Sequence, residues 1–123
     1  MQDYKKLLVW EKASEFSYLV YSFTSFFPKN EEFGLISQFR RAAISVCANI
    51  AEGRGKDSEK DFVRFLSIAK GSLNECGAYI TLAHNLGFLT INQKDELQKK
   101  CGEVGYLLFR FSQKIKEGIY KIV

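Results

Sequence analysis

Apolar residues recur at alternating intervals of three and four in four separate stretches of this 123-residue chain. Such intervals place the apolar side chains on one stripe of an α-helix and are typical of helices packed nearly parallel to their neighbours. The first stretch spans residues 7–27, and its stripe comprises Val9, Ala13, Phe16, Val20, Phe23 and Phe27. Pro28 follows directly and ends the predicted helix, because proline lacks the N–H that a helix interior requires.

The second stretch predicts a helix over about residues 32–51 that is apolar on two sides. Its main stripe comprises Leu35, Phe39, Ala42 and Val46, followed by Asn49 or Ile50, and a second, smaller face comprises Ile44, Ala48 and Ala51. A helix that is apolar on two sides is usually buried on both. Because one side of each helix in a four-helix monomer meets water, the second face indicates an interface between subunits.

The third stretch has the most regular pattern in the chain. Its stripe comprises Phe62, Leu66, Ala69, Leu73, Cys76, Ile80 and Ala83. Ser58 and Asp61 match the serine-x-x-acid capping box that begins many helices. The helix is expected to continue to about Leu86 and to end at Gly87, because glycine adopts the left-handed conformation at little cost.

The fourth stretch begins with a further capping-box pair, Thr90 and Gln93. Its stripe comprises Leu97, Cys101, Val104, Leu108, Phe111 and Ile115, and the helix is expected to end near Gly118. Four such helices joined by short turns predict an all-α fold, an antiparallel up-down four-helix bundle. A chain of this length fits one domain, residues 1–123.

The positive charge is concentrated in the middle of the chain. The net charge is +4, and residues 40–70 carry seven Lys or Arg against four Asp or Glu. The predicted cationic patch lies on the hairpin formed by the second and third helices and comprises Arg40, Arg41, Arg54, Lys56, Lys60 and Arg64. Arginine suits phosphate because its planar fork donates two parallel hydrogen bonds. The alternative is that this modest surplus only keeps the protein in solution.

Polar residues form a row along the second predicted helix that includes Ser45, Asn49 and Glu52. We favour a buried polar network of Ser45, Asn49, Glu52 and Glu75 that fixes helix register, and the alternative is a binding stripe. Glu52 and Glu75 could also approach each other as an acid/base pair. The turn at residues 53–56 reads Gly-Arg-Gly-Lys. We interpret it as a plain turn in which Gly53 stops the helix, although such a turn can also form an anion nest.

Cofactor and metal chemistry finds little support in the sequence. The single histidine, His84, lacks the Glu-x-x-His spacing of di-metal bundles. The three cysteines Cys47, Cys76 and Cys101 occupy apolar helical positions and are expected to be free thiols in a reducing compartment. We therefore expect no metal and no cofactor. No signal peptide or membrane span is apparent, and a cytoplasmic location with no membrane partner is expected.

Several short motifs resemble a known family. They are Leu7-x-Val9-Trp10-x-Lys12-Ala13, then Phe39 to Ser45 (FRRAAIS), Ala48 to Gly53 (ANIAEG), Gly71-Ser72-Leu73-x-Glu75 and Gly87-Phe88-Leu89. They resemble the 23S ribosomal RNA intervening-sequence proteins over nearly the whole chain. The resemblance implies an up-down bundle that assembles into a ring, a homopentamer. It also implies similarity to the accessory variability protein of diversity-generating retroelements, a basic pentameric barrel that works with a reverse transcriptase and nucleic acid.

The expected function follows from the cationic patch and the resemblance together. We expect a non-enzymatic, oligomeric bundle that binds the backbone of RNA or DNA, because no base-reading motif accompanies the patch. The alternative is a protein-interaction scaffold that docks a partner enzyme without contacting nucleic acid. An enzyme that uses Glu52 and Glu75 is a more distant alternative.

Overall fold

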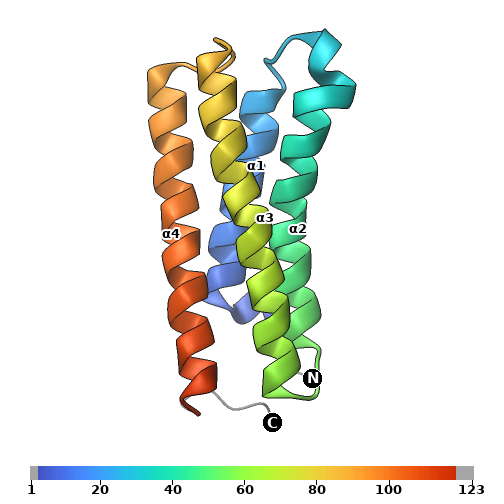
Figure 1. Cartoon of the computed structure of the whole chain (residues 1–123), viewed down its shortest axis with the longest axis vertical. Helices are drawn as coiled ribbons and strands as arrows, with labels where there is room; N and C mark the ends of the chain where they lie inside the picture. Colours follow the sequence, from blue (N-terminus) through green and yellow to red (C-terminus); the bar gives the residue numbers. More distant parts are fainter. Residues whose placement is uncertain (1–2, 119–123) are drawn as a thin grey trace.

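The computed structural model describes residues 3–118. Its long elements are α1 (Leu8–Thr24), α2 (Ser37–Arg54), α3 (Glu59–Asn85) and α4 (Ile91–Lys116), which run alternately up and down side by side (Figure 1). Each helix packs against its neighbours in the order α1–α2–α3–α4 and back to α1. Short helical turns at Tyr4–Lys6, Lys29–Glu31 and Glu32–Ile36 complete the regular structure of the described residues. The predicted antiparallel four-helix bundle is confirmed.

The apolar stripes meet at the axis of the bundle. All seven stripe residues of α3 are buried, as are Phe39, Ala42, Val46 and Ile50 of α2. Phe16, Phe39 and Phe62 are the largest side chains that are completely buried. Burying each large apolar side chain contributes about 1.5–3 kcal/mol. The alternating spacing therefore identified the core that holds the four helices together.

The ends of α3 and α4 follow the expected capping chemistry. The Ser58 hydroxyl accepts a hydrogen bond from the Asp61 N–H at 3.1 Å. Thr90 and Gln93 form a complete capping box, in which each side chain accepts from the backbone N–H of the other. Gly87 and Gly118 have φ of +83° and +76°, so both adopt the left-handed conformation predicted for a helix end.

The start of α2 differs from the prediction. The α-helix begins at Ser37 rather than at residue 32, because Gly34 takes the non-helical angles φ −110° and ψ −111° within a π-helical turn. The Glu31 carboxylate accepts a hydrogen bond from the Leu35 N–H at 3.2 Å and caps this turn. The spacing of apolar residues alone did not show this interruption. Leu35 and Ile36 are buried in the structure, as a continuous helix from residue 32 would also predict.

The end of α2 also differs, because Gly53 does not stop the helix. The helix continues to Arg54, and Gly53 is not among the described glycines with positive φ. A Cβ added at Gly53 would lie 2.8 Å from the Phe65 Cβ and 3.3 Å from the Phe62 carbonyl oxygen. Glycine is therefore required here for the close approach of α2 to α3. It is not needed for a turn. Because Gly53 lies within α2, it is not part of the anion nest considered for residues 53–56.

Among the described residues, no helix is both long enough and apolar enough to cross a membrane.

Candidate nucleic-acid interface

The predicted cationic patch divides into two groups on the hairpin of α2 and α3. Arg40 and Arg41 lie near the start of α2, whereas Arg54, Lys56, Lys60 and Arg64 lie around the α2–α3 turn. Thirteen residues separate Arg41 from Arg54 along α2, which is about 20 Å at about 1.5 Å per residue. The turn is at the same end of the bundle as the start of α1 and the end of α4 (Figure 1). The six cations therefore do not form one continuous surface.

Arg40 and Arg54 are held by side chains of the packed helices. The Arg40 Nε donates to the Thr24 Oγ1 at 2.8 Å, and its guanidinium lies 4.5 Å from the centre of the Tyr21 ring. Arg54 is only 5% exposed, and its guanidinium lies 5.9 Å from the centre of the Phe62 ring. The prediction that Arg54 is a surface contact for a ligand is therefore corrected. The close approach of α2 to α3 at Gly53 places Arg54 in the packed end of the bundle.

The other cations of the turn are grouped around Phe65. The Lys56 Nζ lies 5.0 Å and the Arg64 Cζ lies 4.6 Å from the centre of this ring. Lys56 also pairs with Glu52 at 3.3 Å, and Arg64 pairs with Asp61 at 3.8 Å. Pairs between exposed side chains contribute at most about 1 kcal/mol each. These cations can therefore exchange their carboxylate for a phosphate at little cost.

The polar row of α2 makes a smaller network than predicted. The Ser72 hydroxyl donates to the Ser45 Oγ at 2.8 Å, and the Asn49 Nδ2 donates to the same oxygen at 3.0 Å. Asn49 also donates to the Ser45 carbonyl at 2.8 Å. This network fixes the register of α2 against α3. On α3 its member is Ser72 and not Glu75, the carboxylate that was predicted.

Glu52 and Glu75 are not part of a buried network, and this prediction is corrected. Both are exposed, and Glu52 pairs with Lys56 while Glu75 lies 3.5 Å from the Tyr79 hydroxyl. In the α2–α3 pair, Ser45 faces Ser72 and Gly53 faces Phe65. Glu52 is therefore level with residue 65, and Glu75 lies about 15 Å further along α3 at about 1.5 Å per residue. This offset separates the two carboxylates too far for an acid/base pair.

The three thiols are unsuited to chemistry at neutral pH. Burial raises the pKa of Cys47 and Cys76, and it raises the pKa of Cys101 to about 11. A thiol must lose its proton to attack a substrate or to bind a metal. All three cysteines are free, and no group of three or more potential metal ligands occurs among residues 3–118.

A second set of cations, which the sequence analysis did not single out, lies on α4 and the facing side of α3. It comprises Lys70, Arg110, Lys114 and Lys116, all exposed. Within residues 3–118, no carboxylate lies within 4.0 Å of a nitrogen of these four side chains. A signal was present in the sequence, since residues 104–116 contain three cations and no Asp or Glu.

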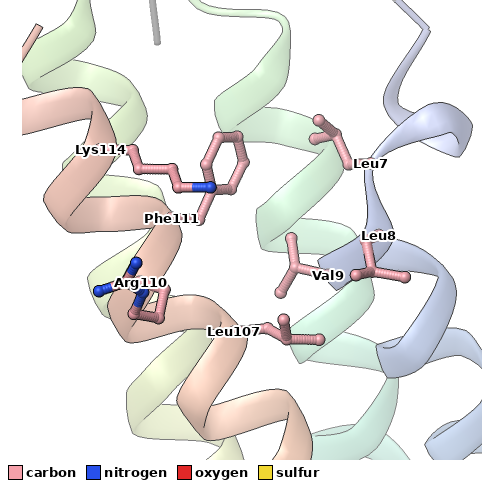
Figure 2. Close-up of a pocket in the computed structure, with 7 residues that line it drawn as sticks. All are labelled: Leu7, Leu8, Val9, Leu107, Arg110, Phe111 and Lys114. Atoms are coloured by element: carbon pink, nitrogen blue, oxygen red, sulfur yellow. The ribbon is translucent and has the colours of Figure 1, made fainter. Parts of the chain in front are cut away.

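These cations border two grooves beside α4. The α1–α4 groove has a volume of about 160 Å³ and is mainly apolar, with Leu7, Leu8 and Val9 facing Leu107 and Phe111. Figure 2 shows Arg110 and Lys114 on its α4 side, with the Arg110 guanidinium pointing away from the leucines. The α3–α4 groove has a volume of about 240 Å³, and its polar lining includes Ser67, Lys70, Ser112, Gln113 and Lys116.

Comparison with known proteins agrees with this fold and these motifs. Among solved structures, a protein of unknown function from the S23 ribosomal protein family of Bacteroides thetaiotaomicron is similar, with a TM-score of 0.77 and 27% identity. The match covers 85% of this chain and 98% of that one. No curated protein matches significantly. The model of the 23S rRNA-intervening sequence proteins matches residues 5–110, so the chain belongs to this family.

Proposed function

We propose that this protein is a non-enzymatic, oligomeric helical bundle that binds the backbone of RNA or DNA. The observation that carries the proposal is the group of cations at the α2–α3 turn: Lys60 and Arg64 are exposed, Lys56 is half-buried, and Lys56 and Arg64 make only weak surface pairs. Arg41 adds a further exposed cation on α2. The family name associates these proteins with ribosomal RNA genes, and neither it nor the similar structure names an enzyme.

The expected mode of binding is electrostatic. Lys and Arg side chains that contact phosphates release counterions, so affinity falls linearly with salt on a log–log scale. The slope is about −0.9 per contact on duplex DNA and about −0.7 on single strands. Contacts to phosphate position a protein on nucleic acid but carry no sequence information. The turn cations should therefore bind different sequences with similar affinity.

Fluorescence anisotropy over a salt series tests the proposal. The test variant replaces Lys56, Lys60 and Arg64 with Gln. The matched control replaces Lys29, Lys94 and Lys99 with Gln, and these three lysines lie towards the other end of the bundle. On duplex DNA the test variant should lose about 2.7 units of slope, three contacts at about 0.9 each. The control should retain most of its slope. Absence of binding by the unmodified protein at low salt would refute the proposal.

The oligomer is proposed from the second apolar face of α2. Ile44 is 47% exposed, Ala48 is exposed and Ala51 is half-buried, so much of this face lacks cover among residues 3–118. It continues into a shallow depression whose apolar lining includes Tyr21 and Phe33, with Glu32, Arg40 and Arg41 at its side, and Phe33 is 91% exposed. Contiguous apolar surfaces of this kind mark interaction sites. The family resemblance favours a homopentamer.

Light scattering tests the assembly. Ile44→Asp should reduce the measured mass towards the 14.1 kDa of one chain, because it places a charge in the proposed interface. Ile68→Asp is the control, since Ile68 is 42% exposed on α3, away from this face. A monomeric mass for the unmodified protein at micromolar concentration would refute the oligomer.

The same apolar surface favours one alternative, a scaffold that docks a partner enzyme without contacting nucleic acid. This alternative predicts a monomer or small oligomer that fails to bind nucleic acid at low salt. It also predicts that Ile44→Asp prevents recovery of one defined protein from nuclease-treated lysate, whereas Ile68→Asp does not.

A further inference from the structure

We propose that the α3–α4 groove binds single-stranded nucleic acid, with Lys70 and Lys116 on its phosphates and Phe109 stacked on one of its bases. The inference rests on the proposed function for its ligand class, but it uses residues outside the α2–α3 turn. It adds a preference for unpaired strands, which the turn cations alone would not provide.

The charge of the groove is the first support. Lys70 comes from α3 and Lys116 from α4, so two helices present a cation to the same space. None of the residues that line the groove is acidic, and neither lysine has a carboxylate within 4.0 Å among the described residues. The positive potential is therefore not cancelled locally, unlike that at Lys56 and Arg64. A ligand that enters this groove should carry negative charge.

The aromatic ring is the second support. Phe109 lines the groove and is 50% exposed, whereas Leu108 beside it is buried. Tyr106 lies one helical turn earlier and is 63% exposed. Proteins that bind single strands combine a cationic groove with aromatic side chains on which bases stack. Bases in a duplex are already stacked on their neighbours, so only an unpaired base can offer its face to Phe109.

The remaining lining residues suit a nucleotide as well. The hydroxyls of Ser67 and Ser112 and the amide of Gln113 supply donors and acceptors between the two lysines. The α1–α4 groove differs, because its lining apart from Arg110 and Lys114 is leucine, valine and phenylalanine, with no hydroxyl or amide side chain. Of the two grooves beside α4, the α3–α4 groove therefore has the mixed lining that both parts of a nucleotide require.

The experiment compares two labelled single strands of equal phosphate number, a thymidine 12-mer and an abasic 12-mer, and adds a 12-base-pair duplex, on which removal of the Phe109 ring should leave binding unchanged. The unmodified protein should bind the thymidine strand roughly fivefold or more tighter than the abasic strand, the lower end of a single stacking interaction. Phe109→Leu keeps an apolar side chain but removes the ring, and should abolish this preference. Phe26→Leu is the control, since Phe26 is also exposed but lies beyond α1.

The lysines are tested by salt dependence on the thymidine strand. Lys70→Gln with Lys116→Gln should reduce the slope by about 1.4 units, two contacts at about 0.7 each. Lys94→Gln with Lys99→Gln removes the same charge from the first half of α4 and should leave the slope nearly unchanged. Circular dichroism should show that each variant remains helical.

The outcomes separate this inference from the proposed function. If the turn variant weakens binding while the groove variants do not, the proposed function stands and the groove inference is overturned. Equal affinity for thymidine and abasic strands also overturns it. A change of mass by light scattering in Phe109→Leu would assign the groove to a subunit interface instead, and would likewise overturn it.

Discussion

The close contact at Gly53 makes a prediction with a definite sign. Gly53→Ala adds a Cβ that would lie 2.8 Å from the Phe65 Cβ, 3.0 Å from the Phe62 Cδ1 and 3.3 Å from the Phe62 carbonyl oxygen. The Phe65 Cβ and the carbonyl oxygen cannot rotate away, because both are fixed by the backbone of α3. Relief therefore requires the two helices to move apart along the contact that buries Phe62.

The magnitude follows from two opposing effects. Overpacking of this kind costs about 1–3 kcal/mol, and the rigid partners place Gly53 towards the upper end. Alanine is favoured over glycine within a helix by about 1 kcal/mol, which offsets part of the cost. We expect a net loss of about 1–2 kcal/mol. With a urea m-value of about 2 kcal/mol per M, the unfolding midpoint should fall by about 0.5–1 M.

Gly71→Ala is the matched control for this measurement. Gly71 lies within α3 and is exposed, and a Cβ there would meet no atom within 4 Å. The same substitution should therefore stabilise the protein by about 0.5–1 kcal/mol. Urea unfolding followed by far-ultraviolet circular dichroism, at fixed protein concentration, measures both variants. Equal or increased stability of Gly53→Ala would show that α2 and α3 do not approach as closely as described.

Three further predictions concern buried polar groups. Ser72→Ala should lower the free energy of unfolding by about 0.5–1.5 kcal/mol, because it removes the 2.8 Å hydrogen bond to Ser45, as measured by urea unfolding. Arg54→Gln should cost about 1–2 kcal/mol, since its guanidinium is buried over an aromatic ring, whereas Lys60→Gln should cost less than about 0.5 kcal/mol. Because burial raises the pKa of Cys101 from 9.0 to about 11, its contribution to stability should be complete below pH 9 and lost between about pH 9 and pH 11. Cys101→Ala should therefore show a smaller decline of the urea midpoint over that range.

The controls for these predictions use residues with similar chemistry but no buried contact. Ser67→Ala on the exposed side of α3 should change stability by less than about 0.5 kcal/mol. A Ser72→Ala variant as stable as this control would contradict the role given to the polar network. If Arg54→Gln behaved like Lys60→Gln, the assignment of Arg54 to packing would be wrong. An unchanged pH profile in Cys101→Ala would contradict the burial argument for that thiol.

The revised distribution of cations changes how binding should be studied. A charge reversal at Arg54 should destabilise the bundle, because the side chain is buried, so its effect on binding would not measure affinity alone. Substitutions at Lys56, Lys60 and Arg64, or at Lys70 and Lys116, alter charges that lie outside the buried core. The two groups share no residue, so separate variants measure their contributions to binding.

The sequence by itself determined the four helices, their apolar stripes and most of their ends. The seven buried apolar positions of α3 follow directly from the alternating interval, because this interval fixes which side of a helix is apolar. Capping at Ser58 and Thr90 and the left-handed Gly87 were also predictable, since they depend on residues a few positions apart. The family motifs point to the same fold, which the family match and the similar structure support.

Only the tertiary structure decided the distance and the axial offset between helices. The offset of α2 against α3 separates Glu52 from Glu75 and brings Ser72 to Ser45 instead. The close approach at Gly53 buries Arg54, which the sequence analysis placed at the surface. The groove that joins Lys70 to Lys116 likewise exists only because α3 and α4 are neighbours. A periodic pattern gives the direction of a side chain from its own helix, whereas its neighbours on another helix depend on packing between the two.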